Sequence, residues 1–119
     1  MKTFLYVETV AIREVEKNRP AIEAVCFDAR ESASSLRAQT LAGFLCVKKA
    51  VVRGLRALDG SIDVHESDIL VGHDEFGAPS IPTMPQRRPD GPPAPAVSVS
   101  HTREHAWGCA VFGEQGTHG

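Results

Sequence analysis

One long amphipathic segment constrains the fold of this chain more than any other feature. Its apolar residues lie largely three and four apart, a spacing that places side chains on one face of an α-helix. They are Leu41, Phe44, Leu45, Cys46, Val51, Val52, Leu55 and Leu58. Lysine and arginine side chains occupy the rest of the surface, and Asp59-Gly60 supplies an end signal. The pattern predicts a helix over residues 41–58.

Runs of β-branched and aromatic residues predict strands on both sides of this helix. The first run is Phe4–Ile12, and the last two are Ala96–Ser100 and Ala106–Phe112, which are typical of an antiparallel pair. Residues 62–71 are predicted to contain one or two short strands. A turn signal at residues 75–79 precedes a further short strand.

Two short helices are predicted between the first strand and the long helix. They cover Ile12–Lys17 and about Ala21–Val25, where a proline suits the first position of the second helix. The order of a strand, then helices, then several strands predicts an α+β fold. The length of 119 residues fits one domain over 1–119, with a proline-rich surface loop at 82–95 and a frayed tail at 113–119.

Composition narrows the classes of function. The formal net charge of −2 argues against nonspecific nucleic-acid binding, although four basic residues of the long helix resemble a phosphate-backbone surface. No aromatic stacking set accompanies those charges. No segment approaches the roughly 18 apolar residues of a membrane-spanning helix. Cys26, Cys46 and Cys109 are odd in number and widely spaced, which is typical of free thiols in a reduced, cytoplasmic protein.

A zinc site is a competing interpretation of the histidines near the carboxyl end. His101, His105 and Cys109 are each four residues apart, so on a helix they would share one face. Residues 107–112 have the pattern of a strand, however, and a fourth ligand is not evident. The sequence therefore favours other roles for these side chains.

Five segments along the chain carry motifs in a fixed order. They are Tyr6–Ile12, Cys26–Glu31, Phe44–Leu55, Asp68–Pro79 and Val97–Thr102. In this order and spacing they resemble the 4'-phosphopantetheinyl transferases, and the small holo-(acyl carrier protein) synthase type in particular. Each motif alone is short and common, but the ordered set covers nearly the whole chain.

The resemblance implies a 4'-phosphopantetheinyl transferase fold, with helices packed on a small and mainly antiparallel sheet. It implies transfer of 4'-phosphopantetheine from coenzyme A to a serine of an acyl carrier protein, with release of 3',5'-ADP. It also implies a homotrimer whose active sites are shared between subunits. On that basis, Glu8 and Ser100–Thr102 of one chain are expected to face the basic residues of the long helix of the next.

The phosphates of coenzyme A need positive charge and hydrogen-bond donors around them. The resemblance assigns the two cationic contacts to Lys48 and Arg53. It assigns coenzyme A binding also to Ser100, His101 and Thr102, whose hydroxyl and imidazole groups are suitable donors. Without the resemblance, the two cations would be a solvated helix flank and the strand end an ordinary turn.

The expected catalytic positions are Glu8, Lys48 and Lys49, and here the chain departs from the family. Magnesium prefers carboxylate oxygens, and Glu8 stands at the family's metal-binding aspartate. Lys49 replaces the family's second magnesium ligand, a glutamate that also helps to remove the serine proton. Three outcomes are open. Lys49 neutralises the pyrophosphate itself, another carboxylate such as Glu31 or Glu66 reaches the site, or the domain is an impaired or inactive relative that binds coenzyme A or a carrier domain without transfer.

Overall fold

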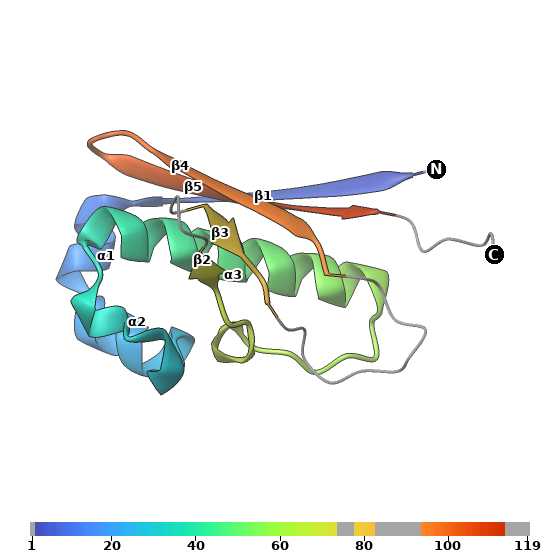
Figure 1. Ribbon diagram of the computed structural model, residues 1–119, viewed down its shortest axis with the longest axis horizontal. Helices are drawn as coiled ribbons and strands as arrows, with labels where there is room; N and C mark the ends of the chain where they lie inside the picture. Colours follow the sequence, from blue (N-terminus) through green and yellow to red (C-terminus); the bar gives the residue numbers. More distant parts are fainter. Residues whose placement is uncertain (1, 74–77, 83–93, 114–119) are drawn as a thin grey trace.

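A three-stranded antiparallel sheet with one long helix on its inner face forms the centre of the fold (Figure 1). The computed structural model describes residues 2–73, 78–82 and 94–113. The strands are β1, Thr3–Ala11, β5, His105–Gly113, and β4, Ala96–His101, in the order β1-β5-β4 across the sheet. Helices and a small antiparallel sheet confirm the predicted α+β class.

The helix α3, Ala38–Leu58, buries one face against this sheet. Every second residue of β5 is buried on the side that faces it, as expected for a strand with one covered face. Phe112 is fully buried there, and burial of such a side chain contributes about 1.5–3 kcal/mol. The predicted helix over 41–58 is confirmed, although it begins at Ala38. Among the described residues, no helix is long and apolar enough to cross a membrane.

Two short helices follow β1 and lie at one end of α3 (Figure 1). The helix α1 covers Ile12–Lys17 and α2 covers Arg19–Cys26, so both predicted helices are confirmed. Two 3-10 turns, η1 at Ala29–Glu31 and η2 at Ala33–Ser35, then lead into α3. Arg19 stabilises this connection, because its Nη2 donates hydrogen bonds to two carbonyl oxygens in and just after η2, at 2.9 and 2.6 Å.

The segment after α3 differs from its prediction. All of residues 62–71 are described, and none is in a strand, so the prediction of one or two strands there is wrong. The chain instead forms a 3-10 turn, η3, Glu66–Asp68, and then the short paired strands β2, Gly72–His73, and β3, Pro79–Ser80. The reason is that the side chains of Lys48 and Glu31 bind backbone groups that a strand would pair.

The other strand predictions, 4–12, 96–100 and 106–112, are confirmed as β1, β4 and β5. Gly113 pairs with Thr3 at the end of the β1–β5 ladder, so the predicted tail does not begin at that residue. Residues 114–119 of that tail lie outside the described residues. So do residues 83–93 of the predicted loop and 74–77 of the turn region.

The outer face of the sheet is exposed and largely apolar. Leu5 is 63% exposed, Val7 46% and Trp107 37%. A shallow pocket of about 250 Å³ lies among these side chains, and Ser100 is part of its lining. Exposed apolar side chains gathered in one place are typical of an interaction surface.

The three cysteines are free thiols. Cys46 is buried between α3 and the sheet, and burial raises the pKa of its thiol to about 11. Because the thiolate is the reactive form, Cys46 is unreactive near neutral pH.

Candidate active site

A pocket of about 310 Å³ opens where α3 passes the middle of β1. Its lining residues are Glu8 from β1, Lys49, Val52, Arg53 and Arg56 from α3, and Glu66 from η3. The residues of α3 are three and four apart, so the helix presents them as one stripe. Three cationic and two anionic side chains therefore meet around one small volume, an arrangement that suits a phosphorylated ligand.

An ion pair between β1 and α3 forms one wall of this pocket. Arg53 Nη1 donates hydrogen bonds to Glu8 Oε2 at 2.7 Å and to the carbonyl oxygen of Val7 at 3.5 Å. The Arg53 side chain is 61% exposed, so the pair contributes at most about 1 kcal/mol to stability. Its main effect is to orient the two side chains. Arg56 is held separately, because its Nη2 donates to the carbonyl oxygen of Val64 at 2.7 Å.

Lys48 points into the core and does not line the pocket. Its side chain has no exposed surface, and its Nζ lies 2.5 Å from Glu31 Oε1 and 2.7 Å from the carbonyl oxygen of Ile69. The same ammonium lies 4.4 Å from the centre of the Phe27 ring. Burial lowers the pKa of Lys48, and the Glu31 carboxylate opposes that shift. A phosphate contact by Lys48 stays a prediction, and it would require this pair to open.

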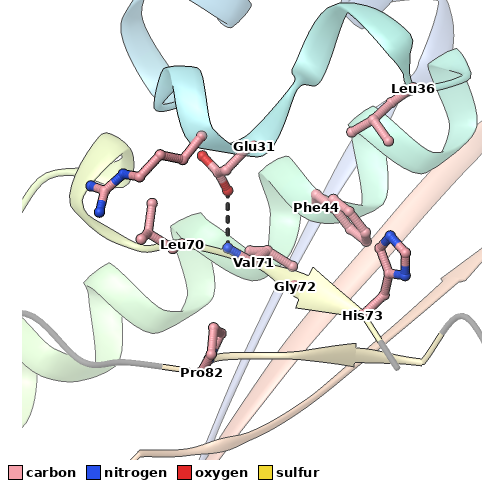
Figure 2. A pocket seen from close by; sticks show the side chains of 9 residues that line it. Glu31, Leu36, Phe44, Leu70, Val71, Gly72, His73 and Pro82 are labelled. Atoms are coloured by element: carbon pink, nitrogen blue, oxygen red, sulfur yellow. Dashed lines mark hydrogen bonds between the residues drawn. The ribbon is translucent and has the colours of Figure 1, made fainter. Parts of the chain in front are cut away.

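Glu31 accepts hydrogen bonds from three parts of the chain. Besides the Lys48 ammonium, its Oε1 accepts the Asp28 N–H at 2.8 Å. Its Oε2 accepts the Val71 N–H at 2.9 Å, the dashed line in Figure 2. The carboxylate therefore joins η1 and α3 to the segment that leads into β2.

A second pocket, of about 400 Å³, has Glu31 in its wall (Figure 2). Leu36, Phe44 and Pro82 supply part of its apolar lining, and the His73 ring stacks on Phe44 at 6.5 Å between centres. Apart from Glu31, which was considered only as a possible replacement carboxylate, no predicted site residue lines this pocket. It is therefore distinct from the predicted phosphate site.

The predicted strand end lies in the hairpin between β4 and β5. Ser100 and His101 are the last residues of β4, and Thr102 closes the turn. The Thr102 N–H donates to the carbonyl oxygen of His105 at 2.8 Å, and its Oγ1 accepts two backbone N–H groups of the turn. All three predicted residues are exposed, and none lines the pocket of Glu8.

Comparison with known proteins gives matches in structure alone. Neither a protein-family model nor a curated protein sequence matches the chain. The Helicobacter pylori holo-[acyl-carrier-protein] synthase in complex with coenzyme A is 22% identical, with a TM-score of 0.73, over 92% of this chain and 100% of that one. The Chronobacterium ammoniagenes ACPS–coenzyme A complex is 19% identical, with a TM-score of 0.75, over 97% and 99%. The chain has the holo-[acyl-carrier-protein] synthase fold.

This synthase fold brings three of the predicted residues together within one chain. Glu8, Lys49 and Arg53 line a single pocket. Within the single chain, Glu8 already lies against Arg53, which binds it at 2.7 Å. That Glu8 faces the long helix of a neighbouring chain stays a prediction. Lys48 lies in the core, and the residues of the β4–β5 hairpin lie outside the pocket.

Sequence reasoning missed Arg56 as a member of this pocket. The signal was present, because Arg56 follows Lys49 by seven residues and Arg53 by three, which places all three on one helical face. Of the two replacement carboxylates considered, Glu66 lines the pocket. Glu31 does not, because it is bound to Lys48.

The magnesium ion that the sequence resemblance implies does not fit the residues present. Magnesium needs one or two carboxylates free to bind it beside the substrate phosphates. Here Glu8 is held by Arg53, and Lys49 lines the same pocket. Within the described ranges, no group of three histidine, cysteine or acidic side chains is arranged to hold a metal ion.

The zinc interpretation also fails in the structure. His105 and Cys109 are both on β5, and four residues of a strand span about 13 Å, too far for two ligands of one zinc ion. Side chains four residues apart come close together only on a helix, and this segment is a strand.

Proposed function

We propose that the protein transfers 4'-phosphopantetheine from coenzyme A to a serine of an acyl carrier protein, with release of 3',5'-ADP. The observation that carries this proposal is the pocket of Glu8, Lys49, Arg53 and Arg56 within a synthase fold. Its excess of positive charge suits the phosphates of coenzyme A. Solved structures with the same fold are complexes with coenzyme A, which supports the proposed substrate.

A second candidate function is binding of coenzyme A or of a carrier domain without transfer. The specific observation in its favour is Lys49, because an ammonium cannot accept the serine proton as the family's glutamate does. Glu66 lies in the same pocket and is the remaining candidate for a general base.

The transfer assay separates the two candidates. The protein is incubated with coenzyme A, magnesium and an apo acyl carrier protein, and the carrier is weighed by mass spectrometry. We expect a gain of one phosphopantetheine group. Ser100→Ala/His101→Ala should lower the rate by about tenfold or more, because each lost hydrogen bond to a charged group costs about 1.5–3 kcal/mol. Ser34→Ala, an exposed serine outside the site, is the control.

Two results decide between the candidates. No gain on several carriers, with coenzyme A still bound, would favour the binding function. A gain that Ser100→Ala/His101→Ala leaves unchanged would keep the transferase and remove the hairpin from its site.

The proposal includes a homotrimer in a reduced, cytoplasmic environment. The exposed apolar face of the sheet supports the assembly, and the free thiols support the environment. In such a trimer, Ser100, His101 and Thr102 of one copy would approach the Glu8 pocket of another. This arrangement would complete a site that each chain holds only in part.

Assembly is tested by native mass spectrometry. We expect a species of three times the 12.8 kDa chain mass. Leu5→Lys should shift it to the monomer, because a charge would be buried in the contact. Val25→Lys is the matched control, since Val25 is similarly exposed, at 56%, but lies on α2. Equal dissociation by both variants, or a monomer before any substitution, would overturn the trimer.

A further inference from the structure

Lys49 is a lysine of the candidate site that forms no ion pair with any of the described residues. It is half-buried and lines the pocket with Glu8 and Glu66. It makes no hydrogen bond or ion pair with any other residue in the part of the chain that the structure describes. Neither of the two carboxylates that line the pocket forms an ion pair with it, so its ammonium is available to a bound anion. Among the described residues, the charge of Lys49 is therefore free to bind a ligand in this pocket.

The neighbouring side chains also leave the pocket with an excess of positive charge. Arg53 neutralises Glu8 across the wall of the pocket, at 2.7 Å. Arg56 is fixed by a backbone carbonyl and keeps its full charge. The five charged groups give three positive and two negative charges, so the pocket carries a net charge of +1. A glutamate in place of Lys49 would reverse this to two positive and three negative charges, which is the composition of a cation site.

We infer that this pocket binds the pyrophosphate of coenzyme A without a divalent metal ion, and that the Lys49 ammonium supplies the charge in its place. This inference rests on the proposed binding of coenzyme A. A lysine is a compact point charge, and it binds phosphate oxygens without the fixed geometry that a metal requires. Two cations of the chain's own lining, Lys49 and Arg56, then neutralise the phosphate charge.

The alternative carboxylates do not restore a metal site. Glu31 is tied to Lys48 and to two backbone N–H groups, so it is not available. Glu66 does reach the pocket, but Lys49 lines the same pocket. The positive charge of its ammonium repels a divalent cation. The same ammonium attracts an anion such as a phosphate group.

Isothermal titration of coenzyme A, and of 3',5'-ADP as a ligand without pyrophosphate, tests the inference. The wild-type protein should bind coenzyme A with the same dissociation constant in EDTA and in magnesium, within about twofold. Lys49→Gln should weaken coenzyme A binding by about tenfold and change 3',5'-ADP binding much less, because the lost charge faces the pyrophosphate. Lys49→Glu should bind coenzyme A only when magnesium is added. Lys17→Glu, an exposed lysine on α1, makes the same charge change outside the pocket and should alter nothing.

The outcomes separate this inference from the proposed function. Coenzyme A binding by wild type that requires magnesium would overturn the inference and leave the transferase proposal standing. Unchanged binding by Lys49→Gln would also overturn it. If neither coenzyme A nor 3',5'-ADP binds in either condition, the proposed function itself fails.

Discussion

Replacing Lys48 with methionine is expected to lower the free energy of unfolding by about 3–5 kcal/mol, because it leaves Glu31 as a buried carboxylate without its cation. The Glu31 side chain is only 4% exposed, so water cannot take over the role of the ammonium. Methionine keeps an unbranched apolar stem, which limits the loss from an empty cavity. Urea unfolding followed by circular dichroism measures the change.

Lys49→Met is the matched control for this prediction. It makes the same substitution one residue further along α3, at a side chain that lines a pocket and has no ion pair among the described residues. Lys49→Met should change the free energy of unfolding by no more than about 0.5 kcal/mol. If the two variants were equally stable, the Lys48–Glu31 pair would not hold the fold together.

A double variant tests the origin of the loss. Glu31→Gln in the Lys48→Met background removes the unpaired charge while its amide oxygen still accepts a backbone N–H group. The double variant should therefore be more stable than Lys48→Met alone. Strictly additive losses would mean that the two side chains are not coupled.

The parts of the fold that the sequence predicted correctly depend on local patterns. The α3 helix follows from apolar residues three and four apart, and β1 from its β-branched and aromatic residues. The strand pair 96–100 and 106–112 carries its own turn between its two halves. Each of these elements is specified by residues within one continuous segment, so no knowledge of distant contacts was needed.

The errors concern contacts between distant segments. Lys48 sits in a run of basic residues and gives no local sign that its partner is Glu31, 17 positions earlier in an irregular segment. The apolar residues of 62–71 suggested strands, but their backbone groups are bound by those two side chains. Likewise, the pairing of Arg53 with Glu8, 45 positions away, depends on how α3 crosses β1.

The stripe of Lys49, Arg53 and Arg56 was predictable in principle. Its spacing is as regular as that of the apolar face of α3. Lys48 and Arg53 are five apart, so they lie on different faces of α3 and do not belong to this stripe together. The same spacing also indicates which of the two adjacent lysines turns inward. Lys48 follows Phe44 by four residues and precedes Val51 and Leu55 by three and seven, so it lies on the apolar face of α3.

The close approach of α3 to the sheet depends on Gly108, and Gly108→Ala should destabilise the protein by about 3 kcal/mol or more. A Cβ atom at this position would lie 2.4 Å from the Val47 backbone nitrogen and 2.7 Å from the Cys46 carbonyl carbon. Both are backbone atoms of α3, so no side-chain rotation relieves the clash. The helix has to move away from β5. Thermal or urea unfolding measures the cost.

Gly43→Ala is the control, since Gly43 also faces the sheet from α3. Its Cβ would lie 3.4 Å from the nearest atoms of Val99, which is ordinary contact. The alanine should be neutral or stabilising by up to about 1 kcal/mol, because glycine is a poor helix former. Comparable losses in both variants would show that the sheet tolerates no added methyl group anywhere along α3.

Gly108 links the packing of the helix to the candidate site. It stands opposite Glu8 in the β1–β5 ladder, next to the point where α3 presents Lys49 and Arg53. A helix displaced from Gly108 carries Arg53 away from Glu8, and the stripe of cations moves with it. Gly108→Ala protein that remains folded should therefore also bind coenzyme A more weakly, whereas Gly43→Ala should not. Stability lost with full coenzyme A binding would mean that the pocket tolerates movement of α3, and that the ion pair of Glu8 and Arg53 does not set its geometry.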